Sequence, residues 1–284
     1  MRGLFCYAGS MELTDTHTHT WFSGHGVGTV EEVVQAACDR GLSMVALTEH
    51  LALPAEVDPE GRFSMSEEQT AQYVAEIEEA RLRHPRIEVI CGAEVDWRVG
   101  AQDFILQRVQ PFEVLLGSVH MLTDEAGMAW EFDYAGAIDG WAERGAANVW
   151  HSYFELWRQA VLSAVPFTVM AHPDLPKKLG FWPDFDTREM YAAMAELAAR
   201  RDVLVEVNTS GLRYRAGEVY PAPALLTAFC AAGVGCTVGS DAHEPGLVGC
   251  DLDKAYAAMR AAGYTQVTVP TRAGDRRCIA LELA

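Results

Sequence analysis

The segment "MELTDTHTHT", residues 11–20, places Asp15, His17 and His19 at alternate positions behind an apolar run. Along an extended strand, side chains two residues apart point to the same side. The spacing therefore predicts that these three side chains project together from the end of a strand. Carboxylate and imidazole groups gathered in this way are suited to binding a metal ion.

Further histidines and carboxylates follow other runs that are typical of strands. The runs "SMVALT", "RIEVICGA", "FEVLLGSV", "PFTVMA" and "GVGCTVGS" are followed, in that order, by Glu49 with His50, by Glu94, by His120, by His172, and by Asp241 with His243. His25 lies in the loop after the first run. A catalytic zinc ion takes about three protein ligands, so seven histidines with Glu94 and Asp241 predict two or three divalent ions. The donor types favour zinc, manganese or iron over calcium or magnesium.

Each of these residues also has an ordinary structural interpretation. A lone histidine is more often hydrogen-bonded within the fold than a ligand, and a carboxylate after a strand is often the N-cap of the next helix. The repeated position behind strands weakens that interpretation for the set. It remains our interpretation for His84 in "RLRHPR" and His151 in "WHSYFELW". Asp15 is expected either to bind metal or to orient a metal-binding histidine.

The strand-like runs alternate with helix-like segments that would position these residues. Examples are residues 29–41, 66–84 and 187–201, and Thr29 and Thr187 are predicted N-caps. The alternation, repeated about seven times, predicts a parallel α/β sheet. The length of chain in these strand–helix units favours a closed barrel over an open sheet. A barrel of this kind has its active site at the carboxyl ends of its strands. "QVTVP" is a further candidate strand, and residues 122–145 are expected to form a long loop or insertion near the site.

Length, charge and cysteine content limit the number of domains and the kinds of partner and compartment that we expect. The 284 residues suit a single domain, residues 1–284, and the formal charge of -18, from 40 acidic and 22 basic residues, disfavours nucleic acid and anionic membranes as partners. Seven scattered cysteines without a CxxC pair fit a reducing cytoplasm. No apolar run approaches the roughly 20 residues of a membrane span. Residues 1–10 are expected to be disordered or to precede a true start at Met11.

The motifs "DTHTH", "TEH", "GAEVDW", "GSVHM", "AHPD" and "GSDAH", in this order over about residues 13–249, resemble those of the polymerase-and-histidinol-phosphatase (PHP) family. "AHPDLPKK" and "EVNTSGLRYRAGEVYP" resemble its histidinol-phosphatase branch. The resemblance implies a distorted seven-stranded (β/α)7 TIM-like barrel with three metal ions. It implies that Glu94 bridges two of the ions. The first ion would be held by His17, His19, Glu94 and Asp241, the second by His25, His50 and His243, and the third by His120 and His172.

Glu49 stands where the family usually has Asp. The ligand His50 itself matches the family, so the difference affects only the supporting role expected of the carboxylate beside it. The resemblance also implies that basic side chains bind the substrate phosphate. Arg213 is the first candidate, followed by Lys177 or Lys178, and Arg215 replaces Arg213 if the loop register differs. The alternative for the two lysines is a solvated helix start.

The implied activity is the hydrolysis of a small phosphate monoester, L-histidinol phosphate, in histidine biosynthesis. We expect a metal-bridging hydroxide to attack phosphorus, with Arg213 stabilising the phosphoryl oxygens. Metal-bound water, His243 or Asp241 would protonate the leaving oxygen. The ammonium and imidazole of the substrate would suit an acidic, aromatic pocket, for which the candidates are Trp97, Asp133 and Tyr220.

Three other functions use similar residues. A phosphoesterase acting on nucleotides or diesters would have the same ligands, although the acidic charge disfavours extended nucleic acid. An amidohydrolase also opens with an HxH motif, but it would leave His25, His50 and His243 without a role. A non-catalytic metal-binding protein would be expected to have lost ligands, and the set here is complete.

Overall fold

Seven parallel strands form the central sheet of the computed structural model, which describes residues 12–123 and 129–281. In sheet order they are β1 (Thr14–Thr18), β2 (Met44–His50), β3 (Glu88–Asp96), β4 (Val114–Ser118), β7 (Val169–Met170), β8 (Leu204–Asn208) and β9 (Cys236–Gly239). At the sheet edges, the backbone N–H of His19 donates to the carbonyl oxygen of Ala242, at 2.8 Å, and that of Asp241 to His17, at 2.8 Å. These bonds nearly close the barrel, which confirms the expected seven-stranded architecture.

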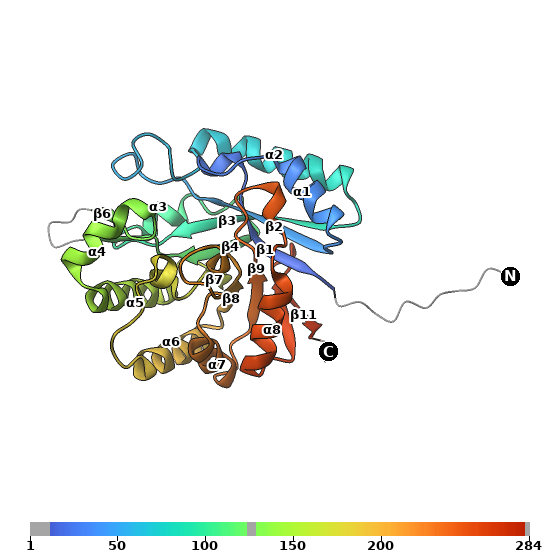
Figure 1. The fold of residues 1–284 in the computed structure, drawn as a ribbon. Coiled ribbons are helices and arrows are strands. Elements are labelled where there is room, and N and C mark those ends of the chain that lie inside the picture. Colours follow the sequence, from blue (N-terminus) through green and yellow to red (C-terminus); the bar gives the residue numbers. More distant parts are fainter. Residues whose placement is uncertain (1–11, 124–128, 282–284) are drawn as a thin grey trace.

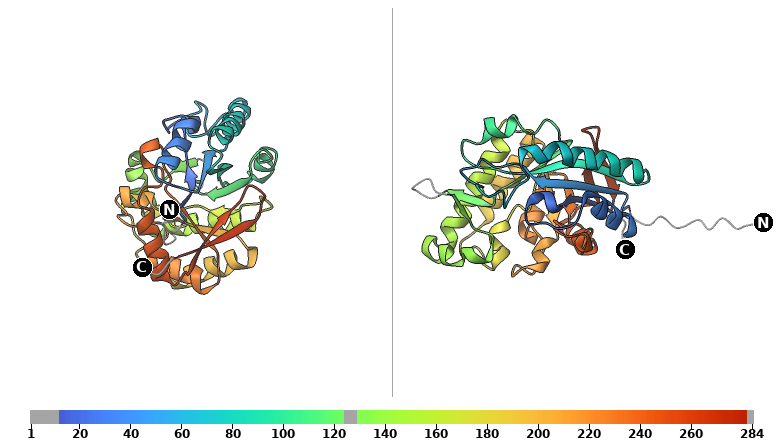
Figure 2. Two further views of the ribbon diagram at one scale, coloured as in Figure 1. Left: turned by 90° about the vertical axis from the view of Figure 1, so that its right-hand side faces the viewer. Right: turned by 90° about the horizontal axis from the view of Figure 1, so that it is seen from above.

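The helices lie outside the sheet (Figures 1 and 2). The strands are buried almost throughout, as expected for a parallel sheet covered on both faces. In chain order the helices are α1 (Val30–Asp39), α2 (Glu67–Arg83), α3 (Gln102–Leu106), α4 (Ile138–Arg144), α5 (Ala146–Leu162), α6 (Arg188–Arg201), α7 (Pro223–Ala231) and α8 (Leu252–Ala262). Within the described ranges, no helix is long and apolar enough to span a bilayer.

The two predicted threonine caps differ in the structure. The Oγ1 of Thr29 accepts a hydrogen bond from the backbone N–H of Glu32, and the carboxylate of Glu32 accepts one from the backbone N–H of Thr29. This reciprocal capping box confirms Thr29 as the N-cap of α1. Thr187 occupies the N-cap position of α6, but its side chain makes no capping hydrogen bond.

Residues 122–145 were expected to form a long loop or insertion near the site. Where they are described, they contain regular structure rather than one continuous loop, and Glu131 and Asp133 line the cavity. The strand β5 (Met121–Thr123) pairs in antiparallel fashion with β6 (Ala129–Glu131), and a 3-10 turn then leads into α4. The expectation about residues 1–10 lies outside the described residues. The hairpin of β5 and β6 was not predicted from the sequence, because each of its strands is only three residues long.

A second hairpin covers the amino-terminal end of the barrel (Figure 2, left). It consists of β10 (Gln266–Pro270), which contains the predicted "QVTVP" strand, and β11 (Arg276–Ala280), and it is separate from the barrel sheet. Its arginines form ion pairs with carboxylates at or just before the starts of barrel strands: Arg272 with Glu113 at 3.3 Å, Arg276 with Asp202 at 2.7 Å and Arg277 with Glu88 at 3.7 Å. The cavity described below lies at the opposite end.

Candidate metal centre and substrate cavity

Nine predicted donor residues meet at the carboxyl end of the barrel. The strands extend further than the sequence indicated, so His17 lies within β1, His50 ends β2 and Glu94 lies within β3, while the others follow strands directly or in loops. The residues surround the inner end of a cavity of about 350 Å³, with His17 and His19 completely buried at its base. The full set is His17, His19, His25, His50, Glu94, His120, His172, Asp241 and His243.

Glu94 is central to this cluster. Its Oε2 lies 3.2 Å from His17 Nε2 and 3.2 Å from His50 Nδ1. Its Oε1 lies 2.9 Å from His172 Nε2 and 3.4 Å from His120 Nε2. Burial alone would raise the pKa of Glu94, but the imidazoles of His50, His17 and His120 hold it well below its usual value. Glu94 is therefore an ionised carboxylate among imidazoles.

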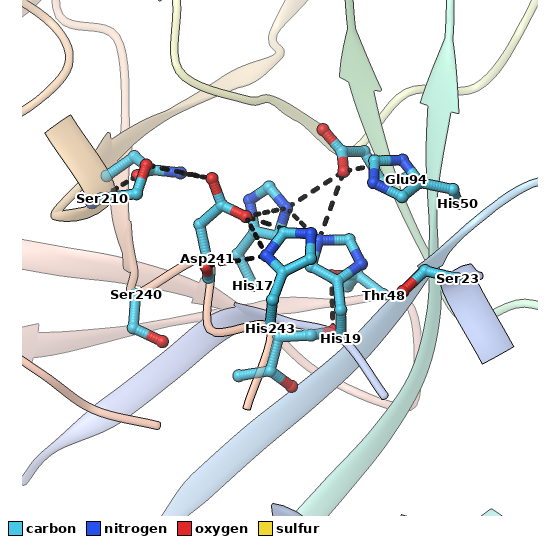
Figure 3. A network of polar contacts seen from close by, with 12 residues as sticks. His17, His19, Ser23, Thr48, His50, Glu94, Ser210, Ser240, Asp241 and His243 are labelled. Atoms are coloured by element: carbon cyan, nitrogen blue, oxygen red, sulfur yellow. Dashed lines mark hydrogen bonds and ion pairs between the residues drawn. The ribbon is translucent and has the colours of Figure 1, made fainter. Parts of the chain in front are cut away.

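The remaining donors continue the cluster from β1 and β9 (Figure 3). The Nε2 atoms of His17 and His19 lie 3.0 Å apart, and so do those of His25 and His243. Asp241 Oδ1 lies 3.5 Å from His19 Nε2, and the rings of His19 and His243 stack at 4.2 Å between centroids. Such close nitrogen pairs require a shared cation or neutral rings, because protonated imidazoles would repel one another.

The donor chemistry of the cluster fits divalent metal ions. Neutral imidazole nitrogens and carboxylate oxygens are suitable ligands for zinc, manganese and iron. Four overlapping triplets place their donor atoms within 4.8 Å of one another: His19, His50 and His243; His17, Glu94 and His172; His17, His19 and Asp241; and His50, Glu94 and His120. His50 belongs to two of these triplets. The geometry therefore also permits an assignment of ligands to ions that differs from the one implied by the resemblance.

Asp15 does not point into the cluster with His17 and His19. The pairing of β1 with β2 is irregular between Asp15 and Thr18, which breaks the simple alternation that we assumed. The buried Asp15 carboxylate instead accepts hydrogen bonds from the N–H groups of Ser240, at 2.9 Å, and Gly249, at 2.8 Å. Asp15 thus holds the loop that carries Asp241, whose backbone has an unusual positive φ of 52°.

Glu49 is also buried and does not contact the ring of His50. Its Oε1 accepts a hydrogen bond from the backbone N–H of Thr20, at 2.7 Å. Glu49 therefore fixes the backbone directly after His19. This contact differs from the supporting role beside His50 that we considered.

Two carboxylates beside the cluster were missed by the sequence analysis. Glu206, in β8, accepts a hydrogen bond from His17 Nδ1 at 2.9 Å. Asp96, at the end of β3, accepts one from the backbone N–H of His120 at 2.7 Å. Both are buried. The available signal was an acidic residue inside an otherwise apolar strand run, as in "LVEVN", because a charge is rarely buried there without a partner.

Two of the predicted phosphate-binding residues line the cavity. The Nη2 of Arg213 donates to the carbonyl oxygens of Ser240, at 2.7 Å, and Asp241, at 3.1 Å, while its Nη1 is buried without a hydrogen-bond partner among the described residues. The Nζ of Lys178 lies 2.7 Å from a carboxylate oxygen of Asp133, which also lines the cavity. Arg215 is exposed and lies outside the cavity lining.

Lys177 does not line the cavity, contrary to our expectation. It lies in a 3-10 turn, Leu175–Leu179, where adjacent side chains point in different directions. Its completely buried Nζ contacts Asp174 at 2.8 Å, Glu218 at 2.7 Å and the carbonyl oxygen of Val219 at 2.9 Å. The contacts of Lys177 are those of a structural ion pair.

Two carboxylates outside the donor cluster, Glu131 and Asp133, also line the cavity. Glu131, from β6, lines it and has no hydrogen-bond or ion-pair partner among the described residues. Burial raises the pKa of Glu131 to about 7, with a further contribution from Asp133. Of the three candidates for an acidic, aromatic pocket, only Asp133 is part of the lining; Trp97 and Tyr220 are buried in the core.

The two histidines interpreted as structural lie away from the cluster. His84 follows α2, and its Nε2 lies 2.8 Å from Glu31 Oε1 on α1. His151 lies on α5 and stacks on Phe185 with 4.5 Å between ring centroids. Neither residue lines the cavity.

The barrel and its donor cluster together define a protein of the distorted βα-barrel class with a candidate metal centre at the carboxyl ends of its strands. The model of the PHP domain matches residues 15–210, and the chain belongs to this family. Asp241 and His243 lie beyond the matched residues, although the structure places them in the same cluster.

Three relatives show the extent of the similarity. A "Probable histidinol-phosphatase" of Deinococcus radiodurans is 35% identical over 260 residues, which cover 90% of this chain and 96% of the relative. The structure of a "putative histidinol phosphatase" from Listeria monocytogenes has a TM-score of 0.77 at 23% identity and covers 85% of this chain and 99% of that one. The structure of a histidinol phosphate phosphatase from Lactococcus lactis, in complex with zinc, L-histidinol and phosphate, has a TM-score of 0.74 at 20% identity and covers 93% and 98%.

Proposed function

We propose that this protein is a histidinol-phosphatase, which hydrolyses L-histidinol phosphate to L-histidinol and phosphate. The observation that carries the proposal is the composition of the cavity lining, which combines seven of the nine donor residues and Arg213 with the carboxylate of Glu131, for which the described residues provide no hydrogen-bond or ion-pair partner. A substrate with a dianionic phosphate and a cationic amino alcohol is complementary to such a cavity. The 35% identical relative supports the same substrate.

The nine-residue cluster would hold two or three ions of zinc, manganese or iron. Bound ions of this kind supply a reactive water at neutral pH and stabilise charge on phosphoryl oxygens. The cluster has only two carboxylates, Glu94 and Asp241, so its own charge does not compensate for that of the ions. A locally positive phosphate site in an acidic protein is the result.

Arg213 binds and orients the phosphate. Its guanidinium is fixed through Nη2 by two backbone carbonyls, which leaves Nη1 available for a charge-assisted hydrogen bond. Lys178 provides a second positive charge in the cavity, although Asp133 partly neutralises it. The phosphate would therefore be bound beside the cluster, next to the loop that carries Asp241.

The leaving oxygen needs a proton, and two residues at the cavity could donate it directly. Asp241 accepts a hydrogen bond from Ser210 Oγ at 3.0 Å, and His243 Nδ1 lies 3.2 Å from the carbonyl oxygen of Asp241. Both residues line the cavity beside Arg213. We assign the role to this pair. Burial lowers the pKa of His243 to about 3, so its imidazole is neutral at pH 7 and would have to take up a proton from the attacking water before passing it to the leaving oxygen.

A comparison of substrates tests the proposal. Phosphate release from L-histidinol phosphate would be measured for the protein reconstituted with zinc or manganese, alongside nucleoside monophosphates and a phosphodiester. We expect kcat/KM for L-histidinol phosphate to be at least about 100-fold higher, because the cavity has basic groups for the phosphate and a carboxylate for the cationic amino alcohol. Equal or higher activity on a nucleotide or diester would contradict the substrate. Metal analysis should return two to three ions per chain.

A further inference from the structure

Glu206 is a completely buried carboxylate in β8 with three hydrogen-bond donors around it. Its Oε1 accepts from His17 Nδ1 at 2.9 Å, and its Oε2 accepts from the backbone N–H of His172 at 2.9 Å and from Asn208 Nδ2 at 3.1 Å. Both oxygens therefore contact only donors. An ionised carboxylate, which accepts and cannot donate, satisfies all three contacts.

The contact with Glu206 determines which nitrogen of His17 carries the proton. Because Glu206 Oε1 can only accept, the hydrogen of the neutral imidazole must lie on Nδ1. The lone pair of His17 then lies on Nε2, the atom that is 3.2 Å from Glu94 and 3.0 Å from His19 Nε2. The ring is thus held in the tautomer that a metal ion in the cluster requires.

The second oxygen of Glu206 stabilises an unusual backbone at His172. His172 has a positive φ of 27°, a conformation that costs energy for a residue other than glycine. Its N–H is bound by Glu206 and its carbonyl oxygen accepts from the hydroxyl of Tyr153 at 3.1 Å. These two bonds hold the ring of His172 with Nε2 directed at Glu94.

The backbone of β9 leaves room for this contact. Gly239 lies so close that a Cβ added to it would be 2.0 Å from Glu206 Oε1 and 2.6 Å from the Cβ of His17. Any other residue at Gly239 would therefore displace the carboxylate or the imidazole. Asn208 extends the same network, since its Nδ2 also lies 3.4 Å from Asp241 Oδ2.

We propose that Glu206 is a positioning residue of the metal centre, which fixes the tautomer of His17 and the backbone of His172 so that donors from β1 and β7 both face Glu94. The inference rests on the proposed metal-binding function of the cluster. Glu206 itself contacts neither the cavity nor, in this proposal, a metal ion. Its effect is transmitted through His17 in β1 and through His172, which follows β7.

Glu206→Gln tests the proposal with almost no change in volume. The amide replaces one carboxylate oxygen with an NH2 group, so a donor would face either His17 Nδ1 or the N–H of His172. We expect the affinity for zinc to fall by about 10- to 100-fold, measured by competition with a chelating dye on the full chain. Glu113→Gln is the matched control, since Glu113 lies at the amino end of the barrel and pairs with Arg272; its zinc affinity should be unchanged.

A spectroscopic measurement on the wild-type protein makes the test independent of the variant's folding. Nitrogen-15 NMR of the imidazoles should show His17 with its proton on Nδ1, with or without zinc. A proton on Nε2, or unchanged zinc affinity in a folded Glu206→Gln protein, would overturn the positioning role. A wild-type protein that binds no zinc, manganese or iron would instead contradict the proposed metal centre, so the two failures are distinguishable.

Discussion

The guanidinium of Arg213 is bound to the backbone of Asp241: its Nη2 lies 3.1 Å from the carbonyl oxygen of that residue. A candidate phosphate ligand and a candidate metal ligand are therefore connected through one peptide group. Any shift of the loop after β9 would move both residues together. The spacing between the phosphate and the cluster is thus set by the backbone rather than by two independent side chains.

Arg213→Ala should weaken substrate binding. A hydrogen bond to a charged group contributes about 1.5–3 kcal/mol, so we expect KM for L-histidinol phosphate to rise about 10- to 100-fold. Arg215→Ala provides the control, because Arg215 is exposed and lies outside the cavity lining. Steady-state kinetics on both variants would measure the difference, and equal KM values would exclude Arg213 from phosphate binding.

Glu131→Gln should change the pH dependence of substrate binding. Burial raises the pKa of Glu131 to about 7, so its carboxyl group is neutral below that pH and negatively charged above it. Binding of a cationic amino alcohol should therefore strengthen as the pH rises through about 7, and the amide variant should lose this rise. The measurement is 1/KM as a function of pH. The exposed Glu143 allows a matched Glu143→Gln control, which should retain the wild-type profile.

Lys177→Met and Lys178→Met should have different effects. The amino group of Lys177 is completely buried between Asp174 and Glu218, and its removal would leave the buried Asp174 carboxylate without its partner. We expect a loss of about 3–5 kcal/mol in the free energy of unfolding, measured by urea denaturation. Lys178→Met should mainly raise KM, since Lys178 lines the cavity. A stable Lys177→Met protein with a raised KM would show that the original assignment of Lys177 to the substrate was right.

Thr29→Ala should destabilise the fold by about 1 kcal/mol, because it removes the side-chain half of a capping box. Thr187→Ala is the comparison, since Thr187 occupies the same position before α6 without a capping hydrogen bond. The free energies of unfolding of the two variants would be compared in denaturant. An equal loss for both would mean that the capping box contributes nothing measurable.

The fold and the location of the site could be predicted from the sequence because their signals are local. An apolar run followed by His or Asp, as at His120 and Asp241, predicts both a strand and the position where that strand ends. The orientation of Asp15 could not be predicted, because it depends on an irregular pairing between β1 and β2. Lys177 and Lys178 could not be separated, because only the path of a short 3-10 turn determines which one faces the cavity.

Glu206 shows another limit of the sequence. Nothing in "LVEVN" indicates that its carboxylate faces His17, since their positions are 189 residues apart and the contact depends on the closure of the barrel. The strand "QVTVP" was correctly located, but its pairing with β11 rather than with the barrel was not predicted, because residues 276–280 were not identified as a strand.

The hairpin of β10 and β11 has a consequence for turnover. Since the cavity lies at the opposite end of the barrel from this hairpin, we expect the substrate to enter and both products to leave through the mouth of that cavity. The alcohol and inorganic phosphate must therefore vacate that cavity before another molecule arrives, and each should act as a competitive inhibitor of the next cycle.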